Sequence, residues 1–388
     1  MIARLVGSEM CIRDRSGDPD EILLDENLWT IDSGQGSFIN GNYEISNTYN
    51  AIQSNLSFYL SNEFSLSDKF KSILGLRAEN YNLYYTGQNQ QGDIVYEDEN
   101  LLNELDLFPS INLIYGLKEM SNLRFSLSRT IARPSFKEKS IAQIFDPVTS
   151  TTFIGNIDIL PTKILNYDLR WELFQENAQM YAISLFYKDF TNPIELVVYN
   201  GASPNDYTPK NVDEAKVYGI ELEFRKNLEF ISESLSNFKL TFNTSIIRSE
   251  EIMDEKEYEG RTKSARSGEV VSRKRELQGQ SPYLVNLGLN YNSINNNFEG
   301  SLNYNVQGKT LQIVGVNYVP DIFTEPFNSL NLNFNYKFGR TDNLKLGLGI
   351  KNLLDEKIES FYYTNDIKSI YSSLSPRREF KLSLGINF

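Results

Sequence analysis

The chain has 388 residues, of which 40% are hydrophobic, 23% charged and 13% aromatic. Its formal net charge of −13 argues against nucleic acid as a partner, because phosphate binding needs a basic face. There is no histidine, which removes the commonest general base and metal ligand, so we predict no catalytic, cofactor or metal site. The single cysteine, Cys11, cannot form an intrachain disulfide. No apolar run reaches the roughly 18 residues that suggest a transmembrane helix.

The first residues are interpreted as foreign to the protein. Residues 5–15 read LVGSEMCIRDR, which resembles the translation of a transposon adaptor used in making sequencing libraries. We therefore interpret residues 1–15 as a sequencing-adaptor artefact, the alternative being a native N-terminal tail. In that case the natural sequence begins near Ser16 without its true N-terminus, and the absence of a signal peptide carries no information. Residues 16–47 are polar and rich in turn residues, and we predict a loop.

From Thr48 onward, apolar and polar residues alternate in one segment after another. Successive side chains of a strand point to opposite faces, so each segment predicts a strand with one apolar and one polar face. The clearest is the last, where one face carries Phe380, Leu382, Leu384, Ile386 and Phe388. About 13 strands are predicted, near residues 48–60, 70–85, 107–115, 123–127, 167–173, 181–187, 218–224, 238–242, 283–291, 298–306, 330–338, 344–350 and 380–388.

The predicted connections alternate between short turns and long loops. Short turns are expected near 65–69, 118–122, 175–177, 292–297 and 339–343, and long loops near 86–100, 131–163, 200–212, 250–276, 307–326 and 355–376. A short turn joins antiparallel neighbours, so one end of the sheet carries the turns and the other the loops. Outer-membrane barrels have this asymmetry, whereas a secreted β-sandwich has shorter strands and lacks it. We predict an all-β, antiparallel, up-and-down transmembrane β-barrel spanning residues 48–388.

The two faces of the predicted strands fit a barrel. The apolar face would meet lipid and the polar face would line a wet or plugged lumen. The polar face carries Asp168, Arg170, Glu172, Glu221, Glu223, Arg225, Lys345 and Lys351. Tyrosines near strand ends are expected in the aromatic girdles, namely Tyr115, Tyr167, Tyr187, Tyr291 and Tyr336.

Several segments resemble one protein family. Ser126–Phe136, SLSRTIARPSF, resembles a strand-to-loop segment of TonB-dependent outer-membrane receptors, particularly those of Bacteroidota. Gly155–Leu169 resembles a further segment of that family, with Ile157 where proline is usual, and Asn352–Asp355 resembles its N-L-F-D motif, with Leu354 in place of phenylalanine. The terminal aromatic resembles the signal read by the barrel-assembly machinery. The matching motif positions are Arg129, Arg133, Pro134, Gly155, Asn156, Pro161, Tyr167, Asp168, Asn352 and Asp355.

The resemblance implies a plugged barrel of about 22 strands, of which this chain would hold the last 13 or so. The plug domain, the TonB box and roughly nine strands would then precede it. The implied function is active uptake of a large, scarce solute across the outer membrane of a Gram-negative bacterium. Siderophores, cobalamins and oligosaccharides are the implied substrate classes. The implied partners are outer-membrane lipid, the barrel-assembly machinery, the TonB complex and a ligand bound at extracellular loops.

Four further possibilities stay open. One is a passive channel or binding platform, which would have no plug sequence upstream and, as a porin, fewer strands. An outer-membrane enzyme would have to work without a Ser–His or His–metal arrangement. The acidic runs Glu97–Glu99 and Asp254–Glu257 could bind calcium, although a solvated loop is favoured. The basic run Arg273–Arg275 could meet lipopolysaccharide phosphate or an anionic ligand, and here a charged surface loop is favoured.

Overall fold

The computed structural model describes residues 48–388 except 90, 147–148, 200–205, 266–267, 269, 317–318, 340–342, 365–366 and 387–388. The predictions for residues 1–15 and 16–47, and for Phe388, therefore lie outside the described residues. The described part is mostly strand, with one α-helix and two short 3-10 helices. None of these helices is long and apolar enough to cross a membrane.

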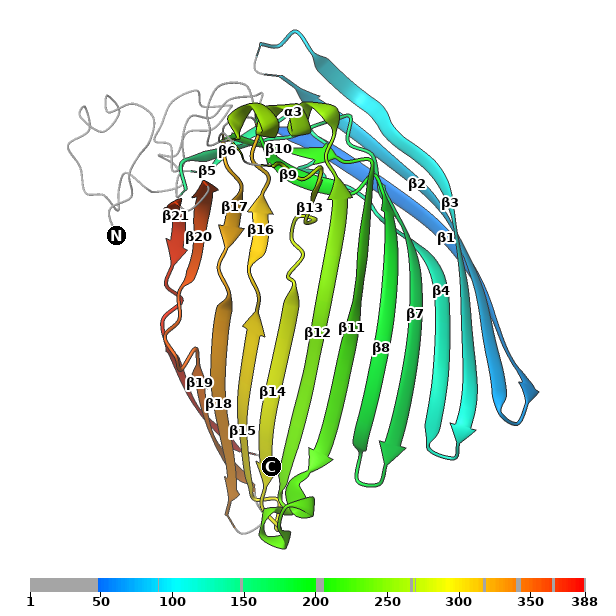
Figure 1. Cartoon of the computed structure of the whole chain (residues 1–388), viewed down its shortest axis with the longest axis vertical. Helices are drawn as coiled ribbons and strands as arrows, with labels where there is room; N and C mark the ends of the chain where they lie inside the picture. Colours follow the sequence, from blue (N-terminus) through cyan, green and yellow to red (C-terminus); the bar gives the residue numbers. More distant parts are fainter. Residues whose placement is uncertain are drawn as a thin grey trace, which may run out of the picture.

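In the described part of the chain, thirteen long strands form one antiparallel sheet, in which each pairs with the next long strand along the chain (Figure 1). The predicted strand order and antiparallel pairing are confirmed. The strands are β1 (Tyr49–Ser67), β2 (Phe70–Gln88), β3 (Val95–Lys118), β4 (Ser121–Ala132), β7 (Thr162–Gln175), β8 (Gln179–Thr191), β11 (Glu214–Asn227), β12 (Phe238–Ile252), β14 (Tyr283–Asn292), β15 (Phe298–Gln307), β18 (Phe327–Phe338), β19 (Leu344–Lys351) and β22 (Glu379–Ile386). A two-residue strand, β13 (Lys274–Arg275), pairs with the end of β12.

Short connections lie at one end of the sheet and long ones at the other, as predicted (Figure 1). Between β7 and β8, Asn177 and Ala178 have φ of 57° and 55°, the left-handed pair that a tight hairpin turn favours. The β11–β12 connection instead holds two 3-10 helices, η3 (Leu228–Phe230) and η4 (Glu233–Leu235). The predicted loop 86–100 was too long, because β3 already begins at Val95. There the polar residues pair with the end of β2 through backbone bonds that need no apolar alternation.

The register keeps the two faces of the sheet distinct. On the outer face, Leu240, Leu289, Leu302 and Leu332 lie opposite one another across β12, β14, β15 and β18. On the inner face, asparagines form a hydrogen-bonded row, in which Asn286 Nδ2 donates to Asn243 Oδ1 over 2.5 Å. Outer-face leucines of central strands stay exposed, with Leu169 at 40% and Leu185 at 49%. Such a surface suits lipid better than water.

The long loops form two further sheets at the loop end, where only loops were predicted (Figure 1). One holds β5 (Gln143–Asp146), β6 (Thr151–Ile154), β10 (Asp206–Asn211) and β9 (Ile194–Val198); the other holds β16 (Thr310–Ile313), β17 (Ile322–Thr324), β20 (Ile358–Thr364) and β21 (Ile367–Leu374). A parallel bridge between Val197 and Val314 joins them. A small core packs beneath the join, formed by Val198, Tyr207, Ile313 and Ile322.

The α-helix of the described part, α3 (Glu255–Ser264), lies in the segment between β12 and β14. Asp254 caps it, because its side chain accepts a hydrogen bond from the Glu257 amide over 2.7 Å. This segment was also predicted as loop, since most of its residues are charged and it shows no apolar stripe.

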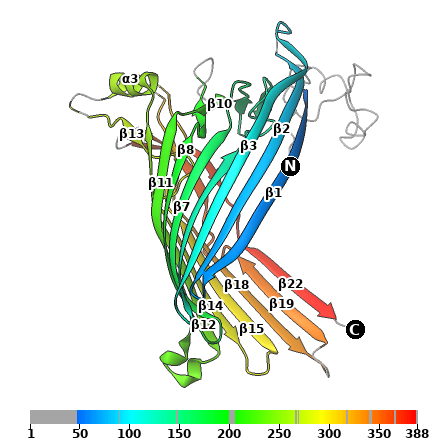
Figure 2. The ribbon, with the colours of Figure 1, turned by 90° about the vertical axis from the view of Figure 1, so that its right-hand side faces the viewer.

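The sheet is curved, and within the described residues its two outermost strands are β1 and β22 (Figure 2). Each of these pairs with one long strand only, β2 and β19 respectively. One row of backbone hydrogen-bonding groups on each edge therefore faces no neighbouring strand of this sheet.

Candidate functional site

Arg133 directly follows β4 and crosslinks three strands on the inner face. Its Nη1 lies 2.7 Å from Glu79 Oε2 on β2, and its Nη2 lies 2.9 Å from Asp106 Oδ2 on β3. The guanidinium also lies over the Tyr81 ring, 4.3 Å from the centroid. Both carboxylates are buried, and Arg133 is the cation that they share, while Arg77 Nε makes a second ion pair with Glu79 at 2.6 Å.

The neighbouring motif residues have different surroundings. Arg129 has the strand parity of Leu127 and so belongs to the outer face, where it pairs with Leu165 across the sheet. Pro134 is buried just after Arg133. Tyr167 is on the outer face, 37% exposed, with its ring 6.0 Å from that of Tyr187. Asp168 lies on the inner face opposite Ser126.

The Gly155–Pro161 motif holds the loop after β4 in place. A Cβ on Gly155 would lie 2.3 Å from the Ser140 carbonyl oxygen, so only glycine fits this close approach. The Asn156 amide donates to Glu138 O over 2.8 Å, and its side chain donates to Pro209 O over 3.1 Å. Pro161 is buried where β7 begins.

Lys139 completes this anchor from within the loop. Its buried ammonium donates to the carbonyls of Ile157 and Ile159 over 2.7 and 2.9 Å. Burial lowers the pKa of Lys139, although distant carboxylates partly oppose the effect. The motif therefore fixes the geometry of the loop.

The Asn352–Asp355 motif is a turn after β19. Asn352 is buried with φ of 49°; its backbone amide donates to Asn331 Oδ1, and its side chain donates to the carbonyls of Glu356 and Arg377. Asp355 has φ of 58°, and its carboxylate lies 3.9 Å from Arg378. On β22, Phe380, Leu382, Leu384 and Ile386 project from one face with exposures of 67, 74, 67 and 52%.

Toward the short turns, charged side chains of the inner face form a row of ion pairs across the strands. Arg124 Nε lies 2.5 Å from Glu172, and Arg170 contacts both Glu172, at 3.2 Å, and Glu223, at 2.9 Å. Arg170 also donates to Ser184 Oγ. The predicted polar face is therefore largely satisfied by its own cross-strand partners.

A buried charge cluster, which was not predicted from the sequence, lies at the loop end. The Arg275 cluster consists of Arg275 on β13 with Glu195 on β9, Glu251 at the end of β12 and Glu257 on α3. All four side chains are at most 8% exposed. The prediction of a charged surface loop suits Arg273 and Lys274, with side-chain exposures of 51 and 59%, but was wrong for Arg275 and Glu257.

The error has a physical reason. Arg275 stands in a basic run, and its partner Glu195 lies 80 positions away in the sequence. The residues next to Arg275 in the sequence therefore cannot predict this ion pair. Among the described residues, no group of three or more acidic or cysteine side chains is arranged to hold a metal ion, so calcium binding finds no support there.

The second loop sheet carries lysines over aromatic rings. Lys309 Nζ lies 3.3 Å from the Tyr363 centroid and 4.2 Å from that of Phe323. Lys368 Nζ lies 4.0 Å from the Phe361 centroid and 3.1 Å from Glu325. The Tyr363 hydroxyl also donates to Glu325. Polar and aromatic groups of this kind can contact a solute.

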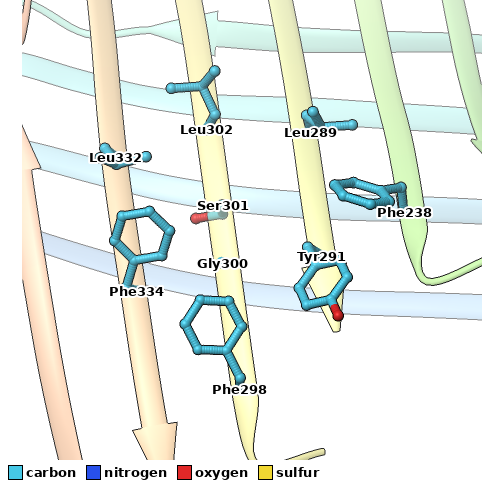
Figure 3. A pocket seen from close by; sticks show the side chains of 9 residues that line it. All are labelled: Phe238, Leu289, Tyr291, Phe298, Gly300, Ser301, Leu302, Leu332 and Phe334. Carbon is cyan, nitrogen blue, oxygen red and sulfur yellow. The ribbon is translucent and has the colours of Figure 1, made fainter. Parts of the chain in front are cut away.

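A shallow apolar groove of about 340 Å³ lies on the outer face near the short turns (Figure 3). Gly300 leaves a gap in the row of side chains, and Tyr291, Phe298 and Phe334 surround it. The rings form a chain across four strands, with centroids 4.8 Å apart for Phe238–Tyr291, 5.8 Å for Tyr291–Phe298 and 5.9 Å for Phe298–Phe334. This resembles an aromatic girdle next to a lipid-facing surface.

The long antiparallel strands, the two-ended connections and the exposed apolar face define a barrel protein of the outer-membrane type. The model of the family "TonB dependent receptor-like, beta-barrel" matches residues 16–353. The chain belongs to this family, which consists of receptors and not of enzymes. No curated protein sequence matches the chain.

Solved structures of TonB-dependent type share the fold. The unliganded ferric citrate transporter FecA is 15% identical with a TM-score of 0.59, over 88% of this chain and 46% of its own. The copper transporter OprC is 16% identical with a TM-score of 0.61, over 87% and 50%. The ferric yersiniabactin uptake receptor FyuA from Yersinia pestis is 15% identical with a TM-score of 0.60, over 88% and 46%. The chain thus spans about half the length of these structures.

Proposed function

We propose that this chain is the C-terminal part of the barrel of an outer-membrane receptor that takes up a large, scarce solute with energy supplied through TonB. The family match over residues 16–353 carries this proposal. The long strands with an exposed apolar face support placement in the outer membrane, with lipid as the partner of that face. The exposed apolar row of β22 is the segment that the barrel-assembly machinery would read.

The mechanism follows from the size of the opening. A barrel of about 22 strands is wide enough to need a plug, so the pore is closed at rest and work must be done to open it. The plug and the TonB box would belong to the preceding part of the complete receptor. The inner-face charges contributed here, such as Arg170 with Glu223, would face that plug or water.

The ligand would be captured at the loop end, where the two loop sheets lie. The Lys309–Tyr363 surface offers cations and ring faces, which suits an anionic or sugar-containing solute. FecA and FyuA are named for ferric citrate and ferric yersiniabactin, and OprC for copper. For this chain the proposed classes are a siderophore, a cobalamin or an oligosaccharide.

Uptake by cells tests the proposal. The complete receptor gene, recovered by sequencing upstream of Ser16, would be expressed in a strain lacking its own receptors, and uptake of labelled members of the three classes would be measured. We expect uptake of one class that stops when the TonB complex is deleted. Equal uptake without the complex, or a gene that encodes no plug, would replace the transporter with a passive channel.

A further inference from the structure

The Arg275 cluster joins four separate pieces of the loop end. Glu195 comes from β9, Glu251 from the last residues of β12, Glu257 from α3 and Arg275 from β13. Beside it, the Gln278 side chain accepts from the Leu196 amide and donates to the Leu196 carbonyl, as a strand neighbour would. This cluster therefore holds α3 and β13 onto the loop sheet.

Arg275 has no donor to spare. A guanidinium carries five N–H groups in a fixed plane. Here Nε donates to Glu257 Oε1 at 2.8 Å, and Nη1 donates to Glu195 Oε1 at 3.0 Å and to the Glu276 carbonyl at 3.1 Å. Nη2 donates to Glu195 Oε2 at 2.6 Å and to Glu257 Oε2 at 3.4 Å. Glu195 and Glu257 thus accept four of these five hydrogen bonds, and the Glu276 carbonyl accepts the fifth.

Glu251 is left without a donor. Its Oε1 lies 2.7 Å from Arg275 Nη2, but neither of its carboxylate oxygens receives a hydrogen bond from any described residue. The side chain is fully buried, at 0% exposure. An ionised carboxylate in such a place costs several kcal/mol, whereas a protonated one becomes a donor itself. Glu195 is the neighbouring acceptor, because both carboxylates contact the same Arg275 Nη2, Glu195 at 2.6 Å and Glu251 at 2.7 Å.

The charges around Glu251 lead to the same conclusion. The carboxylates facing the site are Glu195, Glu257 and, across Arg261, Asp321. Arg261 lies 3.0 Å from Glu257 and binds both oxygens of Asp321 at 2.8 Å. With Glu251 ionised, four carboxylates would face two guanidinium groups, so one proton reduces the excess of buried negative charge.

We propose that Glu251 and Glu195 form a buried proton-binding site, in which a neutral Glu251 donates a hydrogen bond to Glu195 and thereby keeps α3 and β13 docked on the loop sheet, the arrangement called closed below. In agreement with this geometry, burial and the adjacent Glu195 charge raise the pKa of Glu251 to about 9. Burial opposes the ionisation of Glu195, but the hydrogen bonds from Arg275 outweigh it and lower the pKa of that group.

The buried proton gives closure a defined pH dependence. In an open state, with α3 and β13 separated from the loop sheet, Glu251 would have its ordinary pKa of 4.5. In the closed cluster its pKa is about 9. The closed form therefore holds one proton more throughout this window. Closure is favoured at the acidic end, weakens as pH rises, and loses this contribution once the pH passes about 9.

Infrared spectroscopy of the complete receptor in detergent tests protonation directly. The carbonyl stretch of a protonated carboxylic acid is recorded at neutral pH for the wild type, Glu251→Gln and Glu250→Gln. We expect the wild type and Glu250→Gln to share a band that Glu251→Gln lacks and that disappears on titration to alkaline pH. Glu250 is the matched control, because it precedes Glu251 on β12 but pairs with exposed Lys274. An unchanged spectrum in Glu251→Gln overturns the proposal.

The protection of the α3 backbone amides against hydrogen exchange measures how much of the receptor is closed, once the rates are corrected for the intrinsic pH dependence of exchange. In the wild type, protection should fall by up to about tenfold per pH unit between pH 6 and 9. Glu251→Gln, whose amide still donates to Glu195, should stay protected and lose this pH dependence. Glu195→Gln should be poorly protected at every pH, because Arg275 loses its bidentate partner. A Glu251→Gln variant with the wild-type pH profile contradicts the proposal.

Discussion

At the scale of single residues, Arg129 and Arg133 belong to the same sequence motif but have different surroundings. Arg133 is 13% exposed and holds Glu79 and Asp106 together, whereas Arg129 lies on the outer face. Removing one partner from a buried ionic group is far more costly than removing an outer-face charge, because the remaining charges stay desolvated.

The first prediction compares these two arginines. Arg133→Ala should lower the free energy of unfolding of the complete receptor by about 3–5 kcal/mol. Arg129→Ala should change it by less than about 1 kcal/mol. Urea titration in liposomes, followed by tryptophan fluorescence, measures both. The double variant Arg133→Ala, Asp106→Asn should recover part of the loss, since Asp106 is the acid that loses its ion pair, whereas Glu79 keeps Arg77. Equal effects of the two alanine variants would show that Arg133 is no crosslink.

The sequence could identify these motif positions but not what they contact. Gly155 is required because the carbonyl of Ser140 lies against it, and only the folded loop shows this contact. Glu251 gives no local signal at all, since its environment is built by Glu195 and Arg275 from separate elements. Residue types could be identified along the chain, whereas buried pairings required the tertiary structure.

At the scale of elements, the long strands could be predicted because strict alternation over many residues is specific to a strand with two unlike faces. The strands of the loop sheets could not. β5 and β6 have four residues each, and β17 has three, which is too short for a period of two to stand out. Their pairing depends on partners brought together by the barrel, as with the Val197–Val314 bridge.

The second prediction uses the two faces of β15. Leu302 lines the outer groove (Figure 3). Asn303, the next residue of β15, has the opposite strand parity and so belongs to the inner face. Leu302→Arg should destabilise the complete receptor by up to about 2–4 kcal/mol, because an arginine near the lipid midplane is poorly solvated, and by less toward the interface. Asn303→Arg should be close to neutral, since the inner face is polar. The same urea titration compares them, and a larger loss for Asn303→Arg would reverse the assignment of the faces.

At the scale of the whole molecule, the sheet of the described residues ends at β1 and β22 without joining them (Figure 2). In a bilayer no water satisfies the free N–H and C=O groups of an edge strand, which is why membrane sheets close into barrels. The 19 residues of β1 and the 8 of β22 would each present such an edge. The remaining strands of the proposed receptor are what would cover them.

The last prediction concerns this chain expressed by itself. With two uncovered edges, it should aggregate or fail to form a stable pore in lipid, because each unpaired group costs several kcal/mol in hydrocarbon. Refolding into liposomes, followed by gel migration with and without heating and by protease treatment, measures this. The complete receptor, treated in the same way, is the control and should migrate faster unheated and resist protease. If the chain alone behaves like that control, its edge strands β1 and β22 must pair with each other or with those of a second copy. That result would contradict the proposal that the chain is only part of a barrel.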